Sequence, residues 1–326
     1  MNMTNFKKVG LTALAASLVS VSAHAGTLSA SGSASMNTEG FSGEQLDAGS
    51  TFSMANSVKL SGSGEMDNGM TVSVSFELDD SSANGTESPF DDHSVTISSD
   101  SMGTLTLFGH GGKSSVGAID TTAAGDMWDN FDDLSVGAAT IADAITTNTN
   151  GDDSFLYTSP SFAEGLNFTA SYNPQKTNST GSEIGYGVNY SGFEGLTLNY
   201  ASMDIVTGTS STEGDVDVLK ASYAYGPVTA TYSLLDYDVS KTDTAKETTS
   251  YALSYTITDE LSVTYGSEEH DRADSSTDVE IDGISVSYTT GGMTISASTQ
   301  SAENLNFNTG SQYDIDYWAL GASFAF

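Results

Sequence analysis

Residues 70–78 read MTVSVSFEL and alternate strictly between apolar and polar side chains. The even-numbered positions from Met70 to Leu78 are all apolar, whereas the odd-numbered positions from Thr71 to Glu77 are polar or acidic. Successive side chains of a β-strand point to opposite faces. The pattern therefore predicts a strand with one apolar face and one polar face.

The same period of two recurs along the chain. Residues 166–172, 219–225 and 251–257 each place aliphatic and aromatic residues on one face and small or polar residues on the other. No segment of comparable length shows the period of 3.6 that a helix requires. Sixteen strands are predicted after Gly26: residues 27–36, 52–65, 70–78, 92–99, 103–109, 153–159, 166–172, 183–190, 196–203, 216–225, 228–237, 246–257, 261–268, 279–288, 293–301 and 313–326.

Short and long connections alternate between these strands. The short ones carry the Gly, Pro, Asn and Asp that tight turns need, and the long ones are polar and mostly acidic. The short connections are residues 66–69, 159–165, 191–195, 226–227, 259–260 and 290–292. The long connections are residues 37–51, 79–91, 110–152, 173–182, 204–215, 238–245, 269–278 and 302–312.

Two-faced strands occur in soluble β-sandwiches as well as in membrane barrels. Short turns at one end and long loops at the other are typical of an antiparallel barrel across an outer membrane. In lipid, the backbone polar groups are satisfied only if the sheet closes, and sixteen strands leave a water-filled channel. The sequence therefore predicts an all-β fold, a 16-stranded antiparallel transmembrane β-barrel with its apolar face toward lipid.

Composition narrows the classes of partner and chemistry. The chain has 326 residues, with 9 Lys or Arg and 43 Asp or Glu, which gives a formal charge of −34 at pH 7. A surface of this sign repels phosphate, so a nucleic-acid partner is excluded. Cysteine is absent from the sequence, which excludes disulfides, thiolate zinc sites and a cysteine nucleophile.

Residues 1–25 have the features of a signal peptide. Lys7 and Lys8 precede a mostly apolar stretch, and Ala23-His24-Ala25 fits a cleavage site of the A-x-A type. The apolar stretch is shorter than the roughly 20 residues that a membrane-spanning helix requires. We therefore predict that residues 1–25 are removed on export and that residues 26–326 form the barrel.

Three segments resemble a known family. The last predicted strand ends the chain on Phe326 and resembles the terminal strand by which the outer-membrane assembly machinery recognises its clients. Residues 157–172, YTSPSFAEGLNFTASY, are similar to the strand, turn and strand that follow the third long loop of the general (non-specific) porins of Gram-negative bacteria. Residues 103–112, GTLTLFGHGG, and the following SVGAID at 115–120 resemble the strand that leads into that loop and the beginning of the loop.

The resemblance implies a location in the outer membrane of a Gram-negative bacterium, in contact with outer-membrane lipid and lipopolysaccharide. It implies that the third loop, residues 110–152, folds inward and narrows the pore, and that three barrels associate as a homotrimer. The implied activity is passive diffusion of ions and small hydrophilic solutes, with no catalytic step and no cofactor.

In such a pore, the decisive residues set the width and the electric field at the constriction. The third loop carries a run of carboxylates around Met127 and Trp128, and we expect Trp128 and Phe131 to hold it against the wall. A solvated surface loop would also explain an acidic run. The predicted constriction residues are Asp120, Asp126, Asp129, Asp132 and Asp133 of the loop, together with Lys59, Lys113 and Glu77.

General porins usually oppose the acidic loop with a cluster of Arg and Lys on the wall, and this chain departs from that pattern. Its only arginine, Arg272, falls in a predicted exterior loop, and the basic candidates for the lumen are Lys59, Lys113 and Lys220. A wall lined with one sign of charge concentrates counter-ions. The sequence therefore predicts a strongly cation-selective pore.

The outer faces of the predicted strands differ around the barrel. Residues 28–34 and 58–64 offer small and aliphatic side chains, whereas the strands between 183 and 288 present many tyrosines. Tyrosine near strand ends suits the girdles that face lipid. We therefore expect the first strands to face a neighbouring subunit.

Other functions remain open from the sequence. A channel specific for one solute class, such as sugars, would carry aromatic residues along its lumen, but most aromatics are predicted to point outward. An outer-membrane enzyme would need a nucleophile and a base, and His93, His110 and His270 lie in or beside predicted loops without a Gly-x-Ser-x-Gly motif. A secreted β-rich adhesin would show a fixed repeat, which the sequence lacks.

Acidic loops could also bind divalent cations weakly. The example with the densest charge is residues 268–274, EEHDRAD, which lacks the ligand spacing and the glycine of an EF-hand loop. Screened surface charge is the simpler interpretation of this segment.

Overall fold

The computed structural model has an all-β architecture. In the described part of the chain, no helix is long and apolar enough to cross a membrane. The predicted signal peptide, residues 1–25, and Asp133 lie outside the described residues. The structure describes residues 27–44, 50–79, 90–132, 134–136, 139–141, 152–174, 182–207, 212–239 and 245–326.

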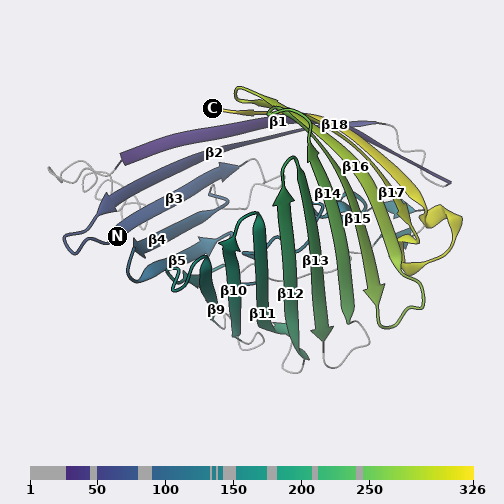
Figure 1. Cartoon of the computed structure of the whole chain (residues 1–326). Helices are drawn as coiled ribbons and strands as arrows, with labels where there is room; N and C mark the ends of the chain where they lie inside the picture. The colour runs from purple at the N-terminus through teal and green to yellow at the C-terminus, as the bar shows by residue number, and fades with distance from the viewer. Residues whose placement is uncertain are drawn as a thin grey trace, which may run out of the picture.

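Sixteen strands form one closed barrel, in which every strand pairs antiparallel with its neighbours in the chain. Figure 1 shows the strands following one another around the wall in chain order. The strands are β1 (Thr27–Gly43), β2 (Thr51–Glu65), β3 (Thr71–Asp79), β4 (His93–Ser99), β5 (Gly103–His110), β8 (Ser154–Thr158), β9 (Leu166–Asn173), β10 (Glu183–Phe193), β11 (Leu196–Thr207), β12 (Thr212–Tyr225), β13 (Val228–Val239), β14 (Lys246–Thr256), β15 (Leu261–Arg272), β16 (Val279–Thr290), β17 (Met293–Glu303) and β18 (Ile315–Ala325). All sixteen predicted strands are therefore confirmed.

The barrel closes where the first strand meets the last. Gly32 and Phe326 exchange backbone hydrogen bonds of 2.8 and 3.0 Å, and the Phe326 ring covers the space above Gly32 that a side chain would fill. Trp318 covers Gly40 in the same way. The aromatic side chains of β18 thus shield the glycines of β1, an arrangement that helps to fix the register of the seam.

Several strand ends differ from the prediction. The last strand begins at Ile315 rather than at residue 313, because Ser311–Tyr313 form a short 3₁₀ turn. Strand β15 continues to Arg272, so residues 269–272, which were predicted to begin a long connection, belong to the wall. The other described 3₁₀ turns are Met127–Asn130 and Leu305–Phe307, and Ser135–Val136 (β6) pairs with Ala139–Thr140 (β7) outside the barrel sheet.

The polarity of the two wall faces changes along the strands. Nearer the short turns, the outward side chains are apolar and exposed, as at Tyr223, Leu253 and Ile284. Toward the long loops, exposed outward positions become acidic, as at Asp236 and Glu280. The inward positions there become apolar and buried: Ala201, Met203, Val216, Val218, Leu235, Val279, Ile281, Ala302, Ile315 and Tyr317.

The expectation of a polar, water-lined inner face is therefore wrong at these inward positions. They form two hydrophobic clusters with residues of the third loop, and this loop removes them from water. Burial of the apolar surface between loop and wall favours the inward position of the loop.

Candidate pore constriction

The third loop, which connects β5 to β8, lies along the inner wall of the barrel. Its hydrogen bonds reach β9, then β12, β13, β14, β15 and β17, in the order in which these strands follow around the wall. The predicted inward-folded third loop is confirmed by these contacts.

Four inward side chains of the wall form the line that the loop follows. Lys220 lies opposite Ser233, Ser233 opposite Ser250, and Ser250 opposite Glu268 on successive strands. We call these residues the polar row. The register of the sheet places the four side chains at one level of the wall. Each of them makes a hydrogen bond to the loop.

The first part of the loop rests on a small apolar patch, here called the first anchor. Val116 and Ile119 of the loop pack on buried side chains of β11, β12 and β13. The backbone N–H of Ser115 donates to the Ser171 hydroxyl at 2.9 Å. The wall residues of the first anchor are Ala201, Met203, Val216, Val218 and Leu235.

Next along the loop, the polar row holds the segment 120–123. The Lys220 ammonium group lies 2.8 Å from a carboxylate oxygen of Asp120 and donates to the Thr122 carbonyl at 2.7 Å. The Ser233 hydroxyl donates to the Thr121 carbonyl at 2.6 Å. The Ala123 N–H donates to the Ser250 hydroxyl at 2.8 Å.

The second part of the loop is held by aromatic packing, here called the second anchor. Trp128 is 3% exposed and Phe131 is fully buried, as expected for side chains that hold the loop to the wall. Phe131 packs at 6.1 Å between ring centroids against Tyr317, and Trp128 packs at 4.8 Å against His270. The buried residues of the second anchor are Met127, Trp128, Phe131, Val136 and Ile141 of the loop, with Val279, Ile281, Ala302, Leu305, Tyr313, Ile315 and Tyr317 of the wall and its adjoining turns.

Glu268, the last residue of the polar row, binds the start of the 3₁₀ turn Met127–Asn130. Its side chain is fully buried, and its two oxygens lie 3.0 and 3.1 Å from the Met127 N–H, which donates to the carboxylate. His270 lies 3.5 Å from the same carboxylate, and its other ring nitrogen lies 2.9 Å from the Thr248 hydroxyl. The buried carboxylate is thus satisfied by the loop and fixes the position of the residues next to it.

Asp126 sits directly before this turn in a left-handed conformation, with φ of 52°. The Asp126 N–H donates to the Thr122 hydroxyl at 2.6 Å. Burial of the carboxyl group, followed by the negative charges of Asp129, Glu268, Asp120 and Asp132, raises the pKa of Asp126 to about 7. This carboxyl group therefore gains and loses its proton near neutral pH.

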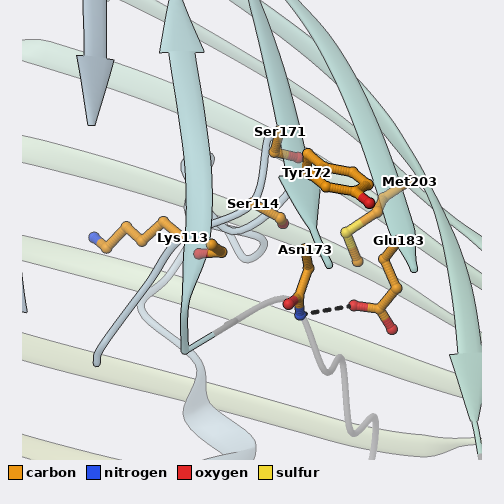
Figure 2. A pocket seen from close by; sticks show the side chains of 8 residues that line it. Lys113, Ser114, Ser171, Tyr172, Asn173, Glu183 and Met203 are labelled. Atoms are coloured by element: carbon orange, nitrogen blue, oxygen red, sulfur yellow. Dashed lines mark hydrogen bonds between the residues drawn. The ribbon is translucent and has the colours of Figure 1, made fainter. Parts of the chain in front are cut away.

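The remaining predicted constriction residues lie in the third loop, on the wall of β2 and β3, and at the start of the loop. Asp129 is exposed and Asp132 half-buried in the same segment as Asp126. The Lys59 ammonium lies 3.7 Å from a Glu77 oxygen across β2 and β3, so the ion pair neutralises this lysine on the wall itself. Lys113 is exposed at the start of the loop, and its ammonium end points away from Glu183, which accepts a 3.3 Å hydrogen bond from Asn173 (Figure 2).

The interpretation of residues 268–274 as an acidic exterior loop, with either screened charge or weak cation ligands, is wrong. Glu268 and His270 point inward and are buried, so they are neither screened surface charge nor ligands on an exterior loop. Arg272 ends β15, where its guanidinium lies 4.2 Å above the Phe307 ring and pairs with Asp274. Glu268 already ended the predicted strand, and extending the alternation by four residues would have placed His270 on the same inner face. Nothing in the sequence distinguishes Ser233 and Ser250 from the other inward serines.

Comparisons with known proteins bear on this geometry. The family model described as Gram-negative porin matches residues 10–281. No curated protein sequence matches the chain significantly. Three solved structures are similar in fold. The anion-selective porin from Comamonas acidovorans has 14% sequence identity and a TM-score of 0.72, and the match covers 92% of this chain and 100% of that one. A loop-deletion mutant of OmpT, an outer membrane protein of Vibrio cholerae, has 12% identity and a TM-score of 0.67, with 92% and 99% covered. A mutant of the Rh. blastica porin has 17% identity and a TM-score of 0.65, with 92% and 100% covered.

The family match covers most of the chain, and the closed barrel agrees with the porin structures along their full length. The outer-membrane location follows from both. The chain belongs to the Gram-negative porin family and is a β-barrel porin of the outer membrane.

Proposed function

We propose that this porin forms a water-filled, cation-selective pore for passive diffusion of ions and small hydrophilic solutes, with its constriction at the third loop. The proposed constriction residues are Asp120, Asp126, Asp129, Asp132 and Asp133, facing a wall that contributes Lys59, Lys113 and Glu77. The observation that carries this proposal is the placement of the acidic segment around Asp126 on the inner wall, between two anchors.

The balance of charge along the described wall supports cation selectivity. Lys220 is paired with Asp120 at 2.8 Å, and Lys59 is paired with Glu77 at 3.7 Å, so two inward lysines are neutralised locally. Burial first, and then the negative charges of the nearby carboxylates, raise the pKa of Asp126. A low-dielectric wall with surplus negative charge attracts cations and repels anions.

The similar Comamonas porin is anion-selective, so the fold alone does not imply cation selectivity. Selectivity belongs to the charges at the constriction rather than to the barrel. The present chain has 9 basic and 43 acidic residues, so we infer the opposite selectivity for it.

We further propose that three copies associate side by side through the first strands. The outward positions 28–34 and 58–64 are small or aliphatic and suit close contact with another wall. Phe52 and Met54 extend this surface toward the long loops and are 64% and 65% exposed in the single chain. Large exposed apolar side chains at that level favour coverage by a partner.

The test is single-channel recording with neutralised loop carboxylates. The triple substitution Asp126→Asn, Asp129→Asn and Asp132→Asn should reduce cation preference strongly, because it removes charge at the narrowest part of the pore. The matched control removes the same number of carboxylates from exposed short turns, through Asp67→Asn, Glu164→Gln and Asp259→Asn. Equal effects of the two triple variants would refute a constriction at the third loop, and conductance in steps of three would support the trimer.

A further inference from the structure

Two of the four histidines in the chain lie opposite one another where β4 and β5 meet the long loops. His93 and His110 are register partners, with a β-bulge directly beside them. The His110 ring has a carboxylate near each nitrogen. Nδ1 lies 3.8 Å from Asp92 Oδ1, and Nε2 lies 3.9 Å from Asp152 Oδ1. Both distances exceed those of hydrogen bonds, so the carboxylates lie beside the ring without hydrogen-bonding to it.

We propose that Asp91, Asp92 and His110 form a binding site for a divalent transition metal of the zinc class. Each residue offers one ligand atom, and these atoms all lie within 4.8 Å of one another. The ligands come from two places in the chain, the residues that lead into β4 and the end of β5. None of these three residues belongs to the polar row or to the proposed constriction residues, although Asp91 and Asp92 share backbone hydrogen bonds with Glu77.

The geometry fits a small ion after modest side-chain rotation. Metal–ligand bonds of about 2.0–2.2 Å place the ligand atoms of a tetrahedral ion roughly 3.3 Å apart. Nδ1 of His110 and Oδ1 of Asp92 are already 3.8 Å apart, and both side chains are about half exposed. Three protein ligands leave the fourth position of a tetrahedral ion to water.

Asp152 supplies the outer interaction that metal-binding histidines usually have. If Nδ1 of His110 binds the ion, Nε2 carries the proton and points to Asp152. A carboxylate at that nitrogen fixes the ring orientation and makes the ligand more basic. Asp152 and His110 would thus form the carboxylate–histidine part of a carboxylate–histidine–metal arrangement. Asp91 and Asp92 would be the two further carboxylate ligands.

The backbone at the site is held firmly. The Asp91 N–H donates to the Glu77 carbonyl at 2.9 Å, and the Glu77 N–H donates to the Asp92 carbonyl at 2.8 Å. Gly111 has φ of +64°, and a side chain on it would collide with the Asp92 carboxylate. The carboxylate therefore lies directly against the first residues of the third loop.

The donor set favours zinc over calcium and magnesium. Imidazole nitrogen with carboxylate oxygen suits zinc and its neighbours in the first transition row, whereas calcium prefers six to eight oxygens. A bound ion would connect His110, where the third loop begins, with Asp91 and Asp92 before β4. Through Asp152, it would also act on the end of the loop. The ion would thus stabilise both ends of the segment that narrows the pore.

The test is calorimetric titration of the folded, chelator-treated protein with zinc chloride, in excess magnesium to occupy weak acidic sites. We expect one zinc ion per chain. His110→Ala and His110→Gln should each abolish this binding, and Asp152→Asn should weaken it about 10-fold, as loss of an outer partner usually does. Asp67→Asn, in a short turn, is the matched control and should leave zinc affinity unchanged.

Equal zinc affinity in the unaltered protein and in both His110 variants would overturn the site, as would the lack of a zinc signal in excess magnesium. Heat-modifiable migration of each variant in electrophoresis verifies that the barrel has folded. Calorimetry needs no conductance, so failure of this proposal and failure of the proposed pore selectivity are distinguishable.

Discussion

The two parts of the third loop are attached to the same wall by different kinds of contact. The segment 120–123 is held mainly by hydroxyl groups and by the ion pair between Asp120 and Lys220. The segment around Trp128 and Phe131 is held by aromatic packing and one buried carboxylate. From this difference we expect the second anchor, with Glu268, to keep the loop inside the barrel, and Lys220 to adjust the charge that the proposed pore presents.

The most severe test of this comparison removes the centre of the second anchor. Phe131→Ala should destabilise the loop–wall packing by about 3–5 kcal/mol, as truncation of a buried aromatic side chain does. Single-channel recordings should show a larger and noisier conductance, because the released loop no longer narrows the pore. Phe162→Ala, at a side chain that is 64% exposed in a short turn, is the control and should leave the conductance unchanged.

Glu268 allows the hydrogen bond and the charge of the second anchor to be separated. Glu268→Ala leaves the Met127 N–H without its acceptor and should cost about 1–3 kcal/mol, measured by thermal unfolding. Glu268→Gln keeps an acceptor but removes a negative charge near Asp126. The glutamine variant should therefore lower the pKa of Asp126 with a smaller loss of stability. Identical losses in both variants would contradict a role for the hydrogen bond.

In the proposed pore, Asp126 should make ion selectivity depend on pH. Its pKa of about 7 means that raising the pH through neutrality adds a negative charge to the loop. Cation preference should therefore increase between about pH 6 and pH 8, and Asp126→Asn should abolish that change. The folded state binds this proton more tightly than the unfolded state, so the contribution of Asp126 to stability falls as pH rises from its ordinary value of 3.8 toward about 7.

Lys220 tests how the ion pair with Asp120 holds the segment 120–123 and affects ion selectivity. Lys220→Met leaves Asp120 without its counter-ion and should increase cation preference, as measured by reversal potential. The carboxylate of Asp120 is 66% exposed, so the loss of stability from the ion pair should be about 1 kcal/mol or less. Lys59→Met provides the comparison on β2. An unchanged reversal potential in Lys220→Met would contradict a contribution of Asp120 to the constriction.

The smallest effects are expected from the hydroxyl groups of the polar row. Ser250→Ala removes the acceptor of the Ala123 N–H and should cost about 0.5–1.5 kcal/mol. Conductance should hardly change, because the second anchor still holds the loop. The double variant of Ser233→Ala and Ser250→Ala measures the energetic coupling between the two hydroxyl groups. A doubled conductance in this double variant would show that the polar row, rather than the aromatic packing, retains the loop.

The barrel could be predicted from the sequence because alternation repeats in sixteen strands and each repeat carries the same information. A single ambiguous strand end does not alter that result. The expected pinning of the loop by Trp128 and Phe131 also followed from their size and their place in an acidic segment.

The docking line of the loop could not be predicted in the same way. Lys220, Ser233, Ser250 and Glu268 come together only through the register of four strands, and register depends on how turns and bulges align. The apolar inner positions, such as Ile281 and Ile315, appear unsuited to a water-filled lumen until the loop that covers them is placed. The alternating pattern identifies the two faces of a strand, but it does not show which part of a face is covered.

We propose that carboxylates held on the inner wall by the third loop determine which ions pass. The reversal potential of the unaltered protein in a planar bilayer, under a gradient of potassium chloride, tests this proposal. We expect a potential of the sign set by potassium, with a preference that increases as the pH is raised through 7. A potential of the sign set by chloride would contradict it.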